Sequence, residues 1–455
     1  MRRALILGAV LGLTGAVIVL PERVLSSPAT SPAVLYTVAR EYDPAAWMHG
    51  GERFPQGAFI HIAGEEKGRP WVRGFAASAD ANVSFDGARV LFAGKQKVSG
   101  TWQIWEASAD GSGPRRVTFC YGDCVSPFYV PDERIAYAHK INGHFVLEIV
   151  PIAGGKPLQL TYGPNNSLPS DILLDGRVLF ETALPGKSAG AEIYTVYTDG
   201  SGVESYRCDH ARSRYAARQV ASGDIVFTIG PGLARFTSAL AHEVSIAAPA
   251  GEYAGDLAET PDGEWLLAWR ADPQSGFALK RWKPGTASLE PIAALEGASA
   301  VQPVLVAGRP TPKIHPTGLH DWANANLLCL NSYTSKYKFA DGSVRKLRMY
   351  TRGPSGQAKL LGSASVENDG SFFVQVPGER PLQIELLDAS GKTLKREAGW
   401  FWMRRGEQRA CVGCHAGPET SPENAVPMAL LRSTTPVDMT GAGPSRHASG
   451  ARGGH

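Results

Sequence analysis

The pentapeptide Cys411-Val412-Gly413-Cys414-His415 is the part of this sequence whose residue types and spacing point most directly to chemistry. Two thiols separated by two residues can each form a thioether with one vinyl group of a haem, and the adjoining histidine then lies beneath the iron as its proximal ligand. The pattern therefore predicts one covalently bound haem c, with Cys411 and Cys414 as attachment residues and His415 as a metal ligand. A zinc site would need a second ligand pair nearby, and a thioredoxin-like pair would need a βαβ context; the sequence shows neither.

The sequence does not decide which residue is the sixth ligand of the iron. The candidates are His315, His320, Met403, Met428, Met439 and His447. We favour His320 as the second metal ligand, then Met428, and an iron with an open position is the alternative. Two histidine ligands would imply a low potential and electron transfer, whereas an open position would permit substrate chemistry. Residues 400–403 (Trp-Phe-Trp-Met) lie just upstream of the motif, and we expect at least one of these rings to lie against the porphyrin.

The four other cysteines divide into two pairs. Cys120 and Cys124 flank the loop Tyr-Gly-Asp and are predicted to close a small disulfide in an oxidising compartment. Cys208 and Cys329 are expected to be buried thiols.

Export from the cytoplasm is predicted by the first residues of the chain. Arg2 and Arg3 precede an apolar run over residues 4–20, and small residues follow at 26–29. These are the three parts of a secretory signal, which we assign to residues 1–29. The apolar run is slightly long, so an uncleaved membrane anchor is the alternative. We expect the mature protein to be periplasmic, outside the cytoplasmic membrane, where cysteines can oxidise.

The charge balance argues against two classes of partner. The 455 residues include 46 Lys and Arg against 43 Asp and Glu, which leaves a formal net charge of +3. This surplus is too small to indicate binding to nucleic acid or to an anionic membrane surface, so a membrane contact is expected only if the signal is uncleaved. The 51 Gly and 32 Pro indicate many short elements and make a helical bundle a poor interpretation.

A repeat with Asp-Gly-like turns begins at residue 79. Its clearest copies lie at 79–119, 124–161 and 166–207, and weaker copies surround Gly223 and Asp262. The equivalent turn positions are Asp86, Asp132, Asp175, Gly223 and Asp262, spaced by 46, 43, 48 and 39 residues. Periods of this size with four strands per unit are typical of β-propeller blades.

We therefore predict an all-β chain that begins with a β-propeller over residues 34–308. Six blades fit the repeats, with seven as the alternative, and residues 301–308 are available to close the ring against strands from residues 34–75. Residues 309–325 contain three prolines and are predicted to be a linker. Six strand-like segments separated by turn residues follow, so we predict a small β-sandwich over residues 326–417 that carries the haem motif. Residues 418–455 are rich in Pro, Ser, Gly and Ala and are expected to form a flexible tail.

Two stretches resemble known families. The repeats over residues 79–207 resemble the exported propeller repeats of the TolB type. The order of propeller, Pro-rich linker with Gly-Leu-His at 318–320, and the segment from Asp369 to His415 resembles the hydrazine synthase α subunit and its relatives. In that family the α subunit carries two c-type haems and works in a multi-subunit complex that makes hydrazine from nitric oxide and ammonium. The resemblance implies that Cys411, Cys414 and His415 match the family's C-terminal haem site, which serves electron transfer.

The N-terminal side departs from that family. The sequence has no second Cys-x-x-Cys-His motif, and only some tens of residues separate the signal from the propeller. We therefore expect no counterpart of the family's N-terminal haem domain, where bond formation is placed, and we do not expect hydrazine synthesis by this chain alone.

The function that we expect is that of a periplasmic monohaem c-type cytochrome. Its haem would pass electrons, while the propeller docks a periplasmic redox partner, the subunits of a complex, or a ligand. The alternatives are a haem-dependent oxidoreductase subunit related to hydrazine synthase α and a TolB-like binding or sensor module with an accessory haem.

Overall fold

The computed structural model describes residues 32–64, 69–183, 190–207, 212–414, 420–421 and 424–441. The residues from Ala33 onward form one compact unit. The predicted signal at residues 1–29, His415 and Cys208 lie outside the described residues. No helix formed by the part of the chain that the structure describes has the length and apolar character needed to cross a membrane.

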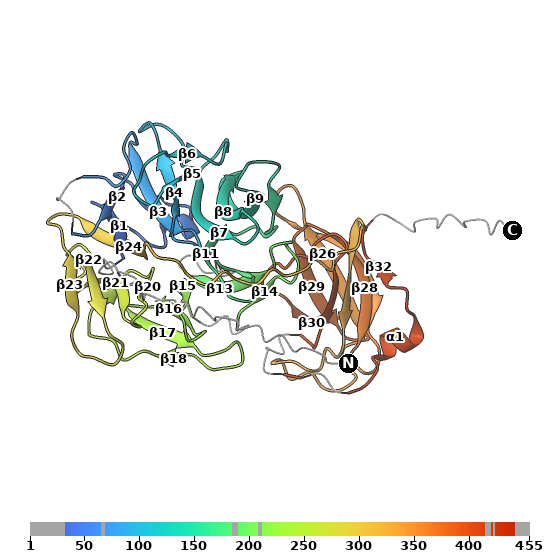
Figure 1. The fold of residues 1–455 in the computed structure, drawn as a ribbon. Helices are drawn as coiled ribbons and strands as arrows, with labels where there is room; N and C mark the ends of the chain where they lie inside the picture. Colours follow the sequence, from blue (N-terminus) through green and yellow to red (C-terminus); the bar gives the residue numbers. More distant parts are fainter. Residues whose placement is uncertain are drawn as a thin grey trace, which may run out of the picture. The chain divides into compact units, whose positions relative to one another are not determined.

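Residues 34–305 form six sheets among the described residues, and their strands are antiparallel (Figure 1). Sheet by sheet, the strands are β24 (Ser299–Leu305), β1 (Val34–Ala39) and β2 (Phe59–Ile62); β3 (Ala77–Val83), β4 (Arg89–Lys95), β5 (Gln103–Ser108) and β6 (Arg115–Arg116); β7 (Cys124–Val130), β8 (Arg134–Ile141), β9 (His144–Pro151) and β10 (Leu158–Gln159); β11 (Ser167–Ile172), β12 (Val178–Ala183), β13 (Ala191–Val196) and β14 (Glu204–Ser205); β15 (Tyr215–Gln219), β16 (Ile225–Ile229), β17 (Gly232–Phe236) and β18 (Val244–Ser245); β19 (Glu252–Tyr253), β20 (Ala258–Glu259), β21 (Trp265–Arg270), β22 (Ala278–Trp282) and β23 (Glu290–Ala293). Because β24 pairs with β1, the last strand of the repeats shares a sheet with the first strands of the chain, which is how a propeller closes its ring.

The Asp-Gly turns of the repeat have a physical reason that the first full copy shows. Asp86 Oδ1 accepts a hydrogen bond of 3.0 Å from the backbone N–H of Ala88, and Gly87 follows with a φ of 77°. A Cβ at Gly87 would lie 2.7 Å from the backbone nitrogen of Gly308. Glycine is therefore required here both by its left-handed backbone and by the close approach of another segment.

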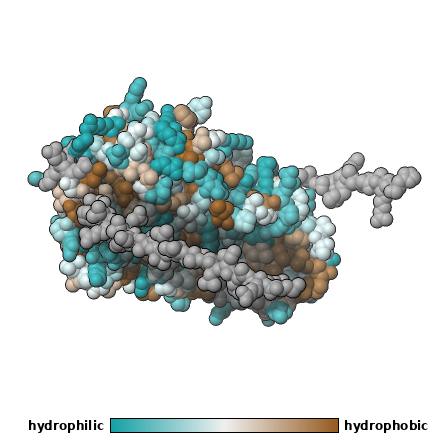
Figure 2. All heavy atoms as spheres, viewed as in Figure 1, coloured by the Kyte–Doolittle hydropathy of each residue, from teal (hydrophilic) through white to brown (hydrophobic). Residues whose placement is uncertain are grey.

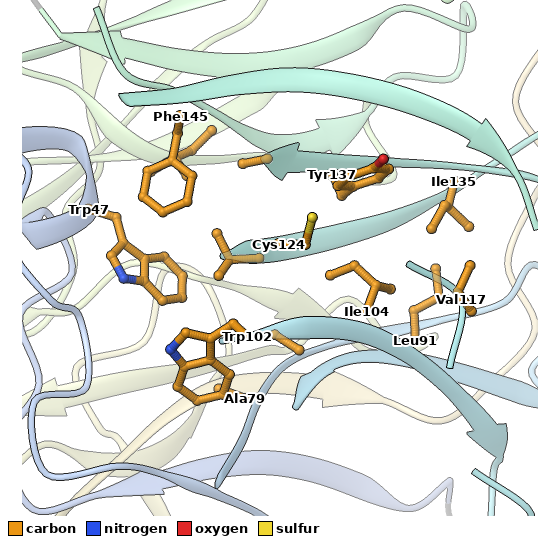
Figure 3. Packing of buried hydrophobic residues seen from close by; sticks show 14 of the residues in the cluster. Trp47, Ala79, Leu91, Trp102, Ile104, Val117, Cys124, Ile135, Tyr137 and Phe145 are labelled. Carbon is orange, nitrogen blue, oxygen red and sulfur yellow. The ribbon is translucent and has the colours of Figure 1, made fainter. Parts of the chain in front are cut away.

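Large aromatic side chains fill the core between the first sheets. Trp47 comes from the short 3-10 helix η1 (Ala46–His49), and its ring lies 6.4 Å from Trp102 and 6.0 Å from Phe145, measured between ring centroids. Figure 3 shows these rings pointing toward one another from separate segments. Residues of helix η1 thus pack in one apolar cluster with residues from the sheets of different repeats.

The C-terminal part is a sandwich of two four-stranded sheets. One sheet has the order β31 (Gln408–Cys411), β25 (Asn324–Cys329), β28 (Phe372–Pro377) and β32 (Val437–Asp438). The other has the order β27 (Ala358–Ser365), β26 (Lys346–Arg352), β29 (Leu382–Leu387) and β30 (Thr393–Arg396). Buried residues of both sheets form one apolar cluster. The predicted all-β class, a propeller followed by a sandwich, is confirmed, and the number of blades stays a prediction.

The predicted flexible tail is wrong for its central part. A short helix, α1 (Met428–Arg432), lies between the haem motif and β32, and β32 pairs in parallel with β28. Figure 2 shows apolar residues gathered at the end of the sandwich where Figure 1 places α1. The segment is rich in Pro and Ser, which favoured the prediction of a flexible tail, but it also contains apolar residues that are buried, Ala429 and Met439.

Candidate haem site

The haem motif begins on a strand at the edge of the sandwich. β31 runs parallel to β25, with Cys411 directly opposite Cys329. Past the strand, the backbone N–H of Asn331 donates to the carbonyl of Val412 at 3.2 Å. A Cβ at Gly413 would lie 2.0 Å from the carbonyl oxygen of Thr334, so only glycine allows the motif to turn this close to the neighbouring loop. The strand and the turn together hold the two motif cysteines in place.

The two motif thiols have different surroundings. Cys411 lines a cavity, and its burial raises the pKa of its thiol. Cys414 packs against the sandwich core beside the buried Cys329, and a hydrogen bond to Cys414 raises the pKa of the Cys329 thiol. Cys329 is buried, as predicted.

The cavity beside Cys411 has a volume of about 620 Å³. Most of its walls come from three parts of the chain: Tyr197 and residues 201–206 around β14, the linker residues His315, Gly318 and Leu319, and residues 407–413 of the sandwich. Arg177 and Ala239 of the propeller complete the lining. Pockets that enclose cofactors and drug-sized ligands have volumes of roughly 300–1,000 Å³. The cavity offers a donor set that suits haem c. Cys411 is on the wall, Cys414 follows the lining Gly413, and the His315 imidazole lies on the linker side.

His315 is held on the cavity wall by the linker backbone. The backbone N–H of Lys313 donates to the carbonyl of Leu174 at 3.0 Å, and a Cβ at Gly176 would lie 2.2 Å from the Lys313 carbonyl oxygen. The His315 ring stacks on Tyr197 with a centroid separation of 3.8 Å. The imidazole is therefore positioned by contacts on the propeller, independently of the sandwich.

His320, the favoured sixth ligand, lies elsewhere. Its ring stacks on Trp322 at 4.3 Å, its backbone N–H donates to the Gly406 carbonyl at 3.1 Å, and it does not line the cavity. Met403 and Met439 are fully buried in the sandwich core. Met428 begins α1 and does not line the cavity either, and His447 lies outside the described residues. Among the candidates that the structure describes, it therefore brings only His315 to the cavity of Cys411.

The aromatic segment before the motif, residues 400–403, does not line this cavity. Trp402 is buried in the propeller core, where its indole N–H donates to the carbonyl of Leu160 at 3.2 Å. Phe401 packs against the sandwich core. The cavity has Tyr197 and Tyr206 as its aromatic lining instead.

Cys120 and Cys124, the predicted pair, are joined by a disulfide. The imidazole of His139 lies next to the two sulfurs, with the donor atoms of all three residues within 4.8 Å of one another.

A second polar site, at the propeller axis, was missed by the sequence analysis. This axial cavity of about 50 Å³ is lined by residues from all six propeller sheets or the segments between their strands, among them Asp80, Ser126, Ser170, Ala216, Asp256 and Gln302. Charged and phenolic side chains join them, among them Arg53, Arg218, Tyr42 and Glu181. A signal exists in the sequence: Asp80, Ser126 and Asp256 each precede the turn aspartate of their repeat by six residues.

The chain is similar to known proteins in both sequence and structure. Residues 335–416 match the family model described as the hydrazine synthase alpha subunit middle domain. Hydrazine synthase subunit alpha of Kuenenia stuttgartiensis is 46% identical over 55 residues, which are 12% of this chain and 7% of that protein. The solved structure of Kuenenia stuttgartiensis hydrazine synthase matches with a TM-score of 0.75 at 17% identity, covering 89% of this chain and 72% of that one. TolB from Acinetobacter baumannii has a TM-score of 0.45 at 13% identity, covering 60% and 66% of the two chains.

The chain is thus an all-β propeller and sandwich protein that shares the fold of the matched hydrazine synthase chain. Within that class it is similar to the hydrazine synthase α subunit, and the family model matches the segment that carries Cys411 and Cys414. The sequence match spans 7% of the curated subunit's length.

Proposed function

We propose that this protein is the haem-carrying subunit of a periplasmic redox complex related to hydrazine synthase, with one haem c bound at Cys411, Cys414 and His415. The observation that carries this proposal is a single cavity of about 620 Å³ lined by both Cys411 and His315. The similarity of residues 335–416 to the hydrazine synthase α family supports it. The curated relative is named a subunit, and we propose that this chain also works with partner subunits.

Each residue has a role in this proposal. Cys411 and Cys414 would form the two thioethers, and His415 and His315 would be the ligands of the iron. Arg177 and Arg409 also line the cavity and suit the negative charges of haem propionates. Haem c, when bound, supplies a one-electron couple whose potential depends on its axial ligands and its burial.

The test is covalent attachment of haem. The full chain should be produced with c-type cytochrome maturation factors and stained for haem after denaturing electrophoresis. We expect one haem per chain in wild type, located in the periplasmic fraction, and loss of the stain in Cys411→Ala with Cys414→Ala. Cys329→Ala is the matched control, since Cys329 lies beside the motif without belonging to it, and it should keep the stain. An unstained wild type, or a double variant that stains like wild type, contradicts the proposal.

The axial ligand has its own test. With His315 bound, the absorption spectrum should be low-spin, and His315→Ala should convert it to a high-spin form that binds carbon monoxide. His320→Ala should leave the spectrum unchanged, because the His320 ring stacks on Trp322 away from the cavity. Ready carbon monoxide binding by wild type would instead support an open iron and substrate chemistry. A spectrum that responds to His320→Ala and not to His315→Ala would show that the linker ligand is misassigned.

A further inference from the structure

The loop that ends at Cys124 brings two sulfurs and an imidazole together on the propeller. Cys124 is fully buried at the start of β7 and lies directly opposite His139 of β8. Cys120 lies four residues earlier and is bonded to Cys124. Figure 3 shows the Cys124 sulfur pointing from its strand, with Tyr137 on the adjacent strand. The sulfur and nitrogen atoms of the three residues lie within 4.8 Å of one another. The ligands of a tetrahedral zinc ion are about 3.5 Å apart, so a small movement would suffice to bind one.

The imidazole of His139 is already oriented in the way that metal-binding histidines are. Its Nδ1 lies 3.0 Å from Glu148 Oε2, and the same carboxylate oxygen accepts a 2.8 Å hydrogen bond from the Tyr137 hydroxyl. A carboxylate on one ring nitrogen fixes the tautomer and leaves Nε2 as the free ligand atom. Glu148 thus occupies the position of the carboxylate in a carboxylate–histidine–zinc arrangement.

The Cys120 backbone is held in place by more than the disulfide. The Gln103 side chain accepts a hydrogen bond from the Cys120 N–H at 2.9 Å and donates to the Cys120 carbonyl at 3.1 Å. A Cβ at Gly122 would lie 2.2 Å from the Lys140 carbonyl oxygen, so the loop is also packed tightly on the end of β8. The two sulfurs would therefore stay close after the bond between them is reduced.

The disulfide lies at the surface on its Cys120 side. Cys120 is half-buried, and Phe119 and Tyr121 on either side of it are exposed. The disulfide closes a span of only four residues, the case in which a crosslink removes the least entropy from the unfolded chain. A stabilising role alone therefore explains this disulfide poorly.

We propose that Cys120, Cys124 and His139 form a redox-switched site for a thiophilic divalent cation such as Zn²⁺. In the reduced state two thiolates and the His139 imidazole bind the ion, and a water molecule completes four-coordination. On oxidation the two thiolates lose two electrons and form the disulfide, and the cation leaves with its charge unchanged. An external disulfide such as oxidised glutathione accepts the two electrons and, with two protons, becomes two thiols. This site is separate from the haem proposal and does not depend on it.

The test uses Co²⁺, whose thiolate charge-transfer and tetrahedral visible bands report this ligand set. The full chain carrying Cys411→Ser and Cys414→Ser, which removes the motif thiols, should be reduced, freed of reductant without oxygen and titrated with Co²⁺. We expect one Co²⁺ per chain, displaced by Zn²⁺, and release of the metal when oxidised glutathione restores the disulfide. Cys120→Ser and His139→Gln should weaken binding at least 10-fold. Glu148→Gln should weaken it roughly 10- to 100-fold by removing the carboxylate from His139.

His144→Gln is the matched control. His144 lies at the start of β9 in the same hairpin, and it is not one of the three residues whose ligand atoms lie close together. It should bind Co²⁺ like the parent protein. Circular dichroism in the reduced state should show that each variant is folded. The proposal is wrong if the reduced parent binds no more Co²⁺ than Cys120→Ser, if His139→Gln binds as tightly as His144→Gln, or if the metal stays bound after the disulfide has formed.

Discussion

Glu181 is a carboxyl group that folding removes from water at the propeller axis. It is buried beside the axial cavity, and its Oε1 accepts a 3.1 Å hydrogen bond from the Ala217 N–H. Burial raises its pKa from 4.5 to about 7, although Arg53 and Arg218 act in the opposite direction. A carboxyl with this pKa is half ionised near neutral pH, which is common at functional sites.

The stability of the protein should therefore depend on pH through Glu181. Because the folded pKa is the higher one, the folded state holds more protons than the unfolded state between pH 4.5 and about 7, and stability falls as pH rises through this window. Glu181→Gln removes this contribution. Relative to wild type, the variant should gain roughly 3 kcal/mol of unfolding free energy between pH 4.5 and pH 8, measured by urea unfolding. Glu290→Gln, an exposed control on β23, should follow wild type. Equal pH dependence of wild type and Glu181→Gln would contradict the assigned pKa.

The two linker histidines show what sequence cannot resolve at the residue scale. His315 and His320 lie in the same Pro-rich stretch, and each is plausible by distance along the chain. Their positions are decided by long-range backbone contacts, Lys313 with Leu174 and His320 with Gly406. Neither contact has a local sequence signal, so the sequence could not show that His315 and not His320 lines the cavity of Cys411, whereas the Cys-x-x-Cys-His pattern is local and can be read from the sequence directly.

At the scale of elements, the short C-terminal strand should contribute to the stability of the sandwich. β32 pairs in parallel with β28, and Met439 directly after it is fully buried in the sandwich core. Met439→Ala should lower the unfolding free energy by about 2–5 kcal/mol because it opens a cavity. Met428→Ala, from the partly exposed start of α1, should cost far less and serves as the control. Similar midpoints for the two variants in guanidinium unfolding would mean that the strand does not pack as the structure shows.

Strands could be predicted where the repeat of apolar and turn residues was clear. They were missed where only a few residues determine whether a strand forms. The strands around Asp86, Asp132 and Asp175 could be recognised because alternating apolar residues and turn signals agree over many positions. β32 is two residues long, and the only fully buried residue beside it is Met439. Trp402 is one of the rings expected near the motif because residues 400–403 precede it closely in sequence. Its true partner, the propeller core, is more than two hundred residues away along the chain.

At the scale of the whole molecule, the propeller and the sandwich are joined by a polar and an apolar contact. Arg404 donates from Nε to the Asp199 carbonyl at 3.0 Å and from Nη1 to the Tyr162 hydroxyl at 2.8 Å. Its neighbour Trp402 is buried among residues of the propeller core. Since the candidate haem cavity has walls from both parts, these contacts also hold the cavity together.

Trp402→Ala should therefore uncouple the two parts. Truncating a large buried aromatic costs about 3–5 kcal/mol, and here the loss falls on the contact between the propeller and the sandwich. We expect guanidinium unfolding of the variant, followed by circular dichroism, to separate into two transitions or to begin at a clearly lower concentration than in wild type. Trp322→Ala is the matched control, because Trp322 is 48% exposed and lies in the same linker region as His320. If both tryptophan variants unfold at the wild-type midpoint in one transition, Trp402 does not join the two parts. If only Trp402→Ala is affected, the contact between the two parts depends on this residue, as the structure indicates.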